Sequence, residues 1–406
     1  MRTRHHSVLL HGEQIGSLHH HDDEVAFRFT DQYWQDGDRN VLGLWFEDKR
    51  LSVSRSNSVL PVWFSNLLPE GILRTWIAQD RGVSVAREME LLLEVGHDLP
   101  GAVQVVQDEG NPYSLDANSA ISPRRNSDSP ASRWKFSLAG VGLKFSMLKV
   151  GERLTIPSGG ELGDWIIKLP DANHPRVPGN EFFCMSLAKK VGISVPELML
   201  VMRDELPHLP DNAWPSGETE AFAIQRFDRT VDRKSIHIED FAQVRGFYPS
   251  DKYLGSFETV AALSYRGSDL SSLLQFVRRL VFNVLIGNGD AHLKNWSLIY
   301  RDGRRPALSP AYDLVSTAGY RDAGDPEDLG LKFAGSRRFE ALTRQGLERL
   351  ERLLEVDKGL LVNEARATAD IFRREWALCY PDLRDLPFIE TWIGPRLDDT
   401  IRRLGD

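Results

Sequence analysis

Short apolar runs separated by turns open the chain, and a helical pattern follows them. Ser7–Leu10 and Val25–Thr30 are apolar runs bounded by turn residues, which is typical of β-strands. Over 72–78, and again over 86–95, apolar residues recur at the spacing of a helix. We therefore interpret residues 1–107 as a small mixed α/β subdomain in front of the rest of the chain.

The next segment interrupts this pattern. Residues 108–132 show no hydrophobic periodicity and are rich in Ser, Pro, Asn and Asp, a composition typical of a flexible linker. Strand-like runs resume at Trp134–Ser137, Phe145–Val150 and Trp165–Leu169. These runs predict a second, β-rich unit after the linker.

A helix and another strand follow. Asn180 is suited to the N-cap of this helix, and Gly192 to the position just after its C-terminus. Ala221–Phe227 then predicts a strand, after which the pattern is mostly helical, with an amphipathic stretch over 273–285.

This order predicts an α+β protein with a β-rich lobe over 133–225 and a helical lobe over 226–406. The two lobes fit a two-lobed protein-kinase-like fold preceded by the small mixed subdomain. Many other α+β proteins would give the same pattern, so the motifs must decide.

Composition excludes several classes of protein without identifying the function. The 406 residues carry 50 Lys and Arg against 58 Asp and Glu, and this net charge of -8 disfavours a surface that neutralises nucleic-acid phosphates. Cys184 and Cys379 are too few for a disulfide framework. No apolar run reaches the roughly 18 residues that a membrane span needs. We therefore expect a cytoplasmic protein.

The segment Asp290–Asn295 has the spacing D-x-x-x-x-N. In a kinase catalytic loop this Asp accepts the proton of the substrate hydroxyl, and the Asn binds Mg²⁺. The spacing alone arises easily by chance. Here it follows the amphipathic helix and a Gly/Asn cluster at 287–289, and the strand-like run Trp296–Tyr300 comes directly after it. This setting favours a catalytic loop.

A predicted hairpin adds a second metal ligand. A turn signal at 301–304 would reverse the chain and bring Asp313 back beside Asn295. Mg²⁺ takes few protein oxygen ligands and uses phosphate oxygens for the rest. Asp313 thus occupies the place of the metal-binding Asp of kinases, although the usual D-F-G sequence is absent. The alternative is that Asp290 caps a turn and Asp313 caps a helix.

Three weaker signals lie upstream in the order that kinases show. Trp165–Lys168 resembles the V-A-I-K strand, whose Lys pairs with the ATP phosphates. Glu181, in the next helix, is the candidate partner of this lysine. The loop 137–144 contains Gly140 and Gly142, which would let backbone N–H groups approach phosphates. Each signal is weak alone, but their joint order is hard to obtain by accident.

Taken together, these motifs resemble the HipA family of serine/threonine kinases, the toxin half of bacterial toxin–antitoxin pairs. The matching stretches are NLLPEG at 66–71, GHDLPGA at 96–102, SLAGV at 137–141, IIKLP at 166–170, NEFF at 180–183, RFDR at 226–229, HIEDF at 237–241, GDAHLKN at 289–295 and LSPAYD at 308–313. The resemblance covers most of the chain except the 108–132 segment and the last helices.

The resemblance implies a role for each matched residue. Asp290 would be the catalytic base, Asn295 and Asp313 the Mg²⁺ ligands, and Glu181 the partner of the ATP-binding lysine. Gln225–Phe227 would be a hinge that meets adenine through its backbone. The implied ATP-binding residues are Ala139, Gly140, Val141, Gly142, Lys144, Lys168, Gln225, Arg226, Phe227, Asp228, His292 and Lys294. For His292 and Lys294, packing and a charge beside the phosphates explain the match as well as a direct catalytic role does.

The resemblance also implies a switch in the glycine loop. Ser137 matches a serine that the family autophosphorylates, an event that ejects the loop and turns the kinase off. The family usually carries Gln where this chain has Gly142. We expect this departure to make the loop more flexible and to alter its nucleotide contacts.

Cofactors and partners follow from the same resemblance. They are ATP and Mg²⁺, and a protein substrate, which in this family is typically a translation factor such as an aminoacyl-tRNA synthetase. The usual antitoxin is a small helix-turn-helix protein, HipB-like, that binds operator DNA. We therefore expect this acidic chain to meet DNA only through the antitoxin.

Two other functions compete with an active kinase. A catalytically silent regulator could bind an antitoxin and DNA through the same fold, but it would not require Lys168, Asp290, Asn295 and Asp313 together. A metal-dependent hydrolase could use Asp290, His292, Asn295 and Asp313. That function leaves the glycine loop, Lys168 and Glu181 unexplained.

Overall fold

The structure of the protein is a computed structural model that describes residues 4–49, 54–107, 143–151, 153–157, 161–209, 213–214, 217–321, 327–379, 383 and 386–405. Several sequence predictions lie outside these residues: the linker at 108–132, the strand Trp134–Ser137, and the loop residues Ser137, Ala139, Gly140, Val141 and Gly142.

The front of the chain folds around an antiparallel sheet with the strand order β4-β3-β2-β1-β5. Its strands are β1 (Arg4–Leu10), β2 (Glu13–His21), β3 (Glu24–Phe29), β4 (Ser54–Asn57) and β5 (Val103–Gln107). Val8, Leu18 and Phe27 are buried on the face that packs against the rest of the unit. The two strands predicted at 7–10 and 25–30 are therefore confirmed.

The helices of the front unit are α1 (Asp31–Gln35), α2 (Leu44–Asp48), α3 (Val62–Ser65), α4 (Gly71–Arg81) and α5 (Glu88–Val95). Helices α4 and α5 correspond to the two predicted helical stretches. Leu73 and Ile77 form the buried side of α4, which ends at Gly82 with a left-handed φ of 67°. This end fits the preference of left-handed helix caps for glycine.

A second five-stranded sheet follows, with the order β7-β6-β8-β10-β9. Its elements are β6 (Lys144–Val150), β7 (Arg153–Thr155), β8 (Trp165–Lys168), β9 (Leu198–Met202) and β10 (Glu220–Gln225), with helix α6 (Val177–Lys190) before β9. The β-rich lobe that the sequence predicted contains these elements.

The start of α6 corrects one prediction. The helix begins at Val177 after Arg176, with Pro178 in its first turn, so Asn180 is not the N-cap. The Asn180 side chain is buried inside the helix, where it donates to the Ser316 carbonyl at 2.9 Å and accepts from the Ser316 N–H at 3.1 Å. A tertiary contact therefore uses the polar group that the sequence suggested for capping.

The rest of the chain is mostly helical. It contains α7 (Phe241–Arg245), α8 (Phe257–Tyr265), α9 (Leu270–Ile286), α10 (Arg344–Leu354), α11 (Leu360–Cys379) and α12 (Pro387–Gly405), and a small sheet of β11 (His237–Asp240), β12 (Ser297–Tyr300) and β13 (Ala307–Leu308). The predicted amphipathic stretch is α9, which is almost entirely buried and ends at Gly287. No helix in the described part of the chain is long and apolar enough to span a membrane.

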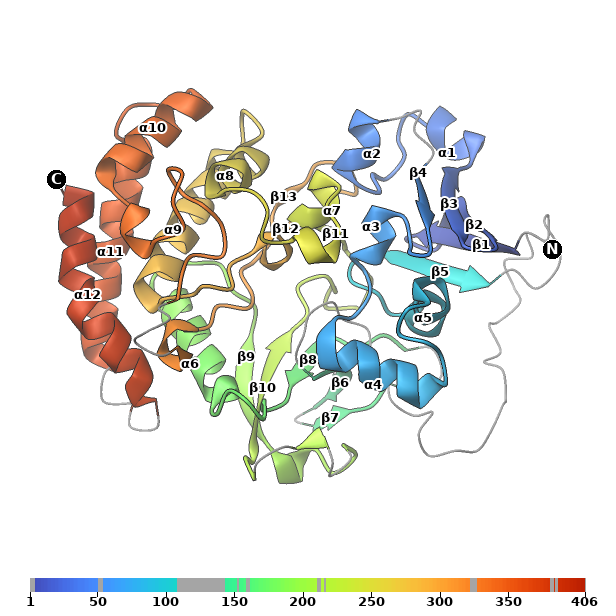
Figure 1. The fold of residues 1–406 in the computed structure, drawn as a ribbon, viewed down its shortest axis with the longest axis horizontal. Helices are drawn as coiled ribbons and strands as arrows, with labels where there is room; N and C mark the ends of the chain where they lie inside the picture. Colours follow the sequence, from blue (N-terminus) through green and yellow to red (C-terminus); the bar gives the residue numbers. More distant parts are fainter. Residues whose placement is uncertain are drawn as a thin grey trace.

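Figure 1 shows the second sheet between α6 and α4. The sheet separates two hydrophobic clusters of side chains. In β10, Phe222 and Ile224 pack with α6 and the helical lobe, whereas Ala221 and Ala223 pack with the front unit. This alternation follows from the period of two in a β-strand. The front unit thus shares a core with the β-rich lobe instead of standing apart from it.

Candidate active site

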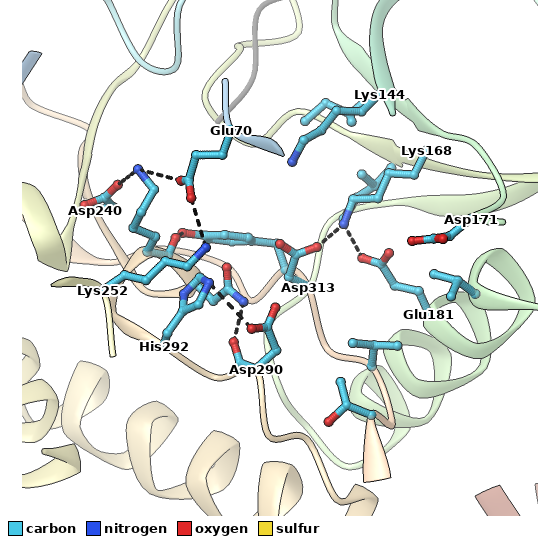
Figure 2. Close-up of a pocket in the computed structure, with 18 of the residues that line it drawn as sticks. Glu70, Lys144, Lys168, Asp171, Glu181, Asp240, Lys252, Asp290, His292 and Asp313 are labelled. Carbon is cyan, nitrogen blue, oxygen red and sulfur yellow. Dashed lines mark hydrogen bonds and ion pairs between the residues drawn. The ribbon is translucent and has the colours of Figure 1, made fainter. Parts of the chain in front are cut away.

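A cavity of about 980 Å³ lies where the front unit, the second sheet and the helical lobe meet. Figure 2 shows Glu70 entering it from the front unit, Lys168 from the sheet, and Asp290 and Asp313 from the helical lobe. Every predicted site residue that the structure describes lines this one cavity: Lys144, Lys168, Glu181, Gln225, Arg226, Phe227, Asp228, Asp290, His292, Lys294, Asn295 and Asp313.

Lys168 joins two carboxylates at one side of the cavity. Its Nζ lies 2.6 Å from Glu181 Oε1 and also forms an ion pair with Asp313 Oδ1. Strand β8 ends at Lys168, and α6 presents Glu181 toward it, so two elements far from the catalytic loop in sequence fix this contact. Asp313 has a left-handed φ of 56°, an unusual backbone conformation for a residue other than glycine.

Burial and neighbouring charges set the ionisation of this group. Burial would raise the pKa of Asp313, but Lys168 and Lys144 hold it well below its usual range. Burial raises the pKa of Glu181 to about 7, because loss of hydration and the nearby Asp313 outweigh the attraction of Lys168. Burial opposes the charge on Lys168, yet Asp313 and Glu181 raise its pKa, so the ammonium stays charged.

Lys144 contributes a second cation to the cavity. It begins β6, is only 8% exposed and points its ammonium into the cavity (Figure 2). Among the described residues, no carboxylate lies within ion-pair distance of its Nζ. Burial accordingly lowers the pKa of Lys144 to about 8, although Asp313 acts in the opposite direction. A buried ammonium of this kind is suited to an anionic ligand.

The catalytic-loop motif is held in shape by amides. After α9 ends, Asn288 Oδ1 accepts from the Asp290 N–H at 3.0 Å. Asn295 Nδ2 donates to the Asp290 carbonyl at 2.7 Å, which closes the loop across the five-residue spacing. The Asp290 carboxylate remains 47% exposed on the cavity side. The D-x-x-x-x-N spacing is thus explained by this hydrogen bond within the loop, in addition to any role of the two residues in catalysis.

The hairpin after the loop brings Asp313 into the same cavity. Strands β12 and β13 pair through Leu298 and Leu308, and the returning chain is tied down by Tyr312, whose hydroxyl donates to the Lys294 carbonyl at 2.9 Å. No helix follows Asp313 directly in the described structure. The alternative that Asp313 is a helix cap is therefore wrong.

The donor set at Asn295 and Asp313 fits Mg²⁺. One carboxylate and one amide oxygen in a cavity open to phosphates match the few protein ligands that this ion takes. In the part of the chain that the structure describes, no group of three His, Cys, Asp or Glu could hold a metal by itself. A metal bound here would need oxygen ligands from another molecule, as it has in nucleotide complexes.

Lys294 has a different environment from the one that phosphate binding suggests. Its Nζ donates to the Asn66 carbonyl at 2.8 Å and to Asp240 Oδ2 at 3.2 Å, and lies 3.5 Å from Glu70 Oε1. The ammonium is therefore saturated by contacts that include two residues of the front unit. His292 is also buried, and burial lowers its pKa despite the nearby Asp290.

The predicted hinge lies at the end of β10. The N–H groups of Gln225 and Arg226 donate to the carbonyls of Glu197 and Asp164, each at 2.8 Å. Phe227 lines the cavity, with its ring 5.6 Å from that of Tyr312.

The Arg226 side chain of the hinge is engaged by carboxylates. It is fully buried between Asp98 and Asp228, at 2.8 Å from each. A backbone N–H contact with adenine would have to come from Phe227 or beyond, because the N–H groups of Gln225 and Arg226 are already used.

Sequence reasoning missed three residues at the site. Tyr253 donates its hydroxyl to Asp290 Oδ1 at 2.5 Å, and Lys252 Nζ lies 2.9 Å from Glu70 Oε2. Glu70 lies in a stretch that the family resemblance includes, which was a usable signal. No spacing links Tyr253 to Asp290, because 37 residues and two helices separate them.

Comparison with known proteins agrees with this architecture. The family model for the HipA N-terminal domain matches residues 6–106, and that for the HipA-like C-terminal domain matches residues 136–375. The chain is 42% identical to Y4dM of Sinorhizobium fredii, provisionally named a kinase, over 91% of this chain and 90% of that protein. It is 28% identical to the serine/threonine-protein kinase toxin HipA of Shewanella oneidensis, over 66% of this chain and 65% of that protein.

A solved structure confirms the fold. HipA in the complex of Shewanella oneidensis HipA, HipB and operator DNA superimposes with a TM-score of 0.71 at 21% identity, covering 98% of this chain and 97% of that one. The predicted two-lobed, kinase-like α+β fold with an additional front unit is therefore correct.

Proposed function

This chain belongs to the HipA family of kinases, and on that premise we propose that it is an ATP- and Mg²⁺-dependent serine/threonine protein kinase. The observation that carries the proposal is the ion-paired Lys168, which holds Glu181 and Asp313 in the cavity that also contains Asp290. A lysine paired with a helix glutamate beside a metal-binding aspartate is the arrangement that phosphoryl transfer by kinases requires.

ATP binding is assigned to the part of the cavity that Lys144, Lys168 and Asp313 line. Lys168 and Lys144 would neutralise phosphate oxygens, since Lys168 pairs with Asp313 and the Lys144 ammonium points into the same cavity. Asp313 and Asn295 would hold Mg²⁺, which when bound offsets the phosphate charge. In the glycine loop, Ala139, Gly140, Val141 and Gly142 remain proposed phosphate contacts.

The transfer step is assigned to Asp290. Its exposed carboxylate would orient the substrate hydroxyl and accept its proton as the oxygen attacks the γ-phosphorus. Burial lowers the pKa of the neighbouring His292. Its side chain is only 6% exposed against 47% for Asp290, so the Asp290 carboxylate is the base that a substrate hydroxyl can reach at this end of the cavity.

The substrate and partners extend the proposal beyond the chemistry. We assign a protein substrate of the translation machinery, such as an aminoacyl-tRNA synthetase, and autophosphorylation of Ser137. We also assign a small helix-turn-helix antitoxin that carries the DNA contact, and a toxin role in the cytoplasm. The net charge of -8 supports this division of DNA binding. The Shewanella oneidensis relative was solved with HipB and operator DNA.

The competing functions are less well supported. A silent regulator would not need a catalytic loop closed around Asp290 or a buried Lys168–Glu181 pair. A hydrolase with its own metal centre would need more ligands than Asn295 and Asp313 supply.

Incubation with γ-labelled ATP and Mg²⁺, followed by mapping of phosphoserine and phosphothreonine, tests the proposal. Incorporation that is about a thousandfold slower in Asp290→Asn is the expected result. No incorporation by the wild-type protein, alone or with candidate synthetases, would contradict it.

A further inference from the structure

The hydroxyl of Tyr253 is the group that contacts the proposed catalytic base. Tyr253 lies between the short 3-10 helix Pro249–Asp251 and α8, and it lines the same cavity as Asp290. Its hydroxyl donates to Asp290 Oδ1 at 2.5 Å, which is the short distance typical of a hydrogen bond to a charged oxygen. Asp290 is otherwise open to the cavity, so this contact is its main restraint.

The contact occupies one carboxylate oxygen and leaves the other. His292 Nε2 lies 3.7 Å from the same Oδ1 that Tyr253 holds. Among the contacts of the described residues, none reaches Asp290 Oδ2. A carboxylate with one oxygen fixed presents the second in a defined direction, which general-base catalysis requires.

Tyr253 is itself fixed to the catalytic loop. The preceding carbonyl, of Lys252, accepts from the Leu293 N–H at 3.0 Å, and the Tyr253 carbonyl accepts from Arg337 Nη2 at 2.6 Å. The ring lies edge-on to His292, with centroids 5.0 Å apart. Two main-chain hydrogen bonds thus fix the backbone at Lys252 and Tyr253, and the ring contact with His292 orients the phenol, which suits a support better than a side chain that moves aside for substrate.

We propose that Tyr253 is a positioning residue for phosphoryl transfer, whose hydroxyl fixes Asp290 Oδ1 so that Oδ2 faces the substrate hydroxyl. The inference rests on the proposed kinase function. In the step, the substrate O–H proton passes to Asp290 Oδ2 while the new O–P bond forms. The bond between the γ-phosphorus and the bridging oxygen breaks, and ADP leaves with that electron pair.

Tyr253 keeps its own proton throughout. Burial raises the pKa of Tyr253, and the Asp290 carboxylate raises it further. The phenol therefore remains a donor across the whole physiological range, and it does not compete with the substrate as a source of the proton.

The test compares Tyr253→Phe with wild type in autophosphorylation by labelled ATP and Mg²⁺. Loss of one hydrogen bond to a charged group predicts a rate at saturating ATP about tenfold lower. The ATP concentration at half-maximal rate should change less than twofold, since the hydroxyl touches the base and not the nucleotide. Tyr248→Phe is the matched control, because that hydroxyl contacts Ser56 and the Leu60 carbonyl instead.

A double-mutant cycle separates positioning from a general structural effect. Tyr253→Phe should cost no further rate in the Asp290→Asn background, because its partner carboxylate is already gone. An equal loss in both backgrounds would show that the hydroxyl acts elsewhere and would overturn the inference. A faster Tyr253→Phe enzyme would also overturn it, since the hydroxyl would then block the acceptor position.

These outcomes are distinct from failure of the kinase proposal. If the wild-type protein incorporates no label, the proposed function and the role of Tyr253 fail together. If wild type is active, Asp290→Asn is about a thousandfold slower and Tyr253→Phe retains the full rate, only the role of Tyr253 fails.

Discussion

Two clusters of charged residues in this protein are alike in composition and differ in how completely their charges are paired. The first, here called the closed cluster, contains Asp98 from the front unit with Arg226, Asp228 and Arg229. The second, the open cluster, lines the cavity and contains Lys144, Lys168, Glu181 and Asp313. Each has two cations and two anions, so net charge does not distinguish them.

Pairing distinguishes the two clusters. In the closed cluster both arginines contact both carboxylates, and Ser146 and the Gly101 N–H add further hydrogen bonds. These side chains are at most 7% exposed. In the open cluster Lys168 takes both carboxylates, and Lys144 has neither. A saturated cluster fixes one domain against another, whereas an unsaturated one retains the capacity to bind a ligand.

The largest expected effect is in the cavity, where replacing Asp290 should slow phosphoryl transfer and leave the fold intact. Asp290→Asn should lower the rate of phosphoryl transfer about a thousandfold, because the general base is removed. The Asn295 contact to the Asp290 main-chain carbonyl survives, so the thermal midpoint and ATP affinity should change little. Single-turnover kinetics and calorimetry measure the two quantities. A residual rate near that of wild type would end the assignment of Asp290 as the base.

The opposite result is expected in the closed cluster. Arg226→Met leaves Asp98 and Asp228 with one cation fewer in a dry environment, and should lower the free energy of unfolding by about 3–5 kcal/mol. Urea denaturation measures the change. The matched control is Arg304→Met, which breaks an exposed pair with Asp38 and should cost less than about 1 kcal/mol. Equal costs would contradict the distinction drawn between buried and exposed pairs.

Replacement of Asp313 tests the open cluster further. It removes a proposed Mg²⁺ ligand and an ion-pair partner of Lys168 at the same time. Loss of a residue that supports a metal site costs roughly tenfold to hundredfold in affinity. Asp313→Ala should weaken Mg²⁺-dependent nucleotide binding by at least this factor. Metal-free binding should not weaken, since Lys168 is released to the phosphates. Calorimetry with and without Mg²⁺ measures both, and Asp302→Ala, in an exposed turn, is the acidic control. Equal losses under the two conditions would contradict the ligand role.

The sequence predicted more of the open cluster than of the closed one, and the reason is physical. Lys168, Glu181, Asp290 and Asp313 lie in short stretches whose residue types and order are dictated by the chemistry of nucleotide transfer. The hydrophobic period located α9, because a buried helix must repeat its apolar face. Such signals are local and can be read along the chain.

Contacts between distant segments left no comparable signal. Asp98 pairs with Arg226 across 128 positions, and Lys294 bonds to Asn66 across 228. Nothing in the local pattern of either segment specifies the other, since long-range ion pairs depend on the completed fold. The same limit explains why the sequence does not predict the contacts of Lys294 with the front unit or the contact of Tyr253 with Asp290.

The smallest expected effect concerns the unpaired Lys144 and is seen as a pH dependence. Its pKa of about 8 lies below the ordinary value of 10.5, so the folded protein loses this proton before the unfolded chain does. Between pH 8 and 10.5 the unfolded state binds more protons, and Lys144 therefore contributes a small rise in stability with pH. Below pH 8 the ammonium is charged, buried and without a carboxylate partner.

Nucleotide binding should show the reverse trend. Bound phosphate stabilises the ammonium, so ATP affinity should fall about fivefold to tenfold from pH 7 to pH 9 as free Lys144 loses its proton. Lys144→Met should bind ATP more weakly at pH 7 and lose most of this dependence. Lys149→Met, on the same strand but stacked on Trp165 instead of facing the cavity, should keep the wild-type profile. If Lys144→Met retains the full pH dependence, another group titrates, and Lys144 is not the unsatisfied cation that separates the open cluster from the closed one.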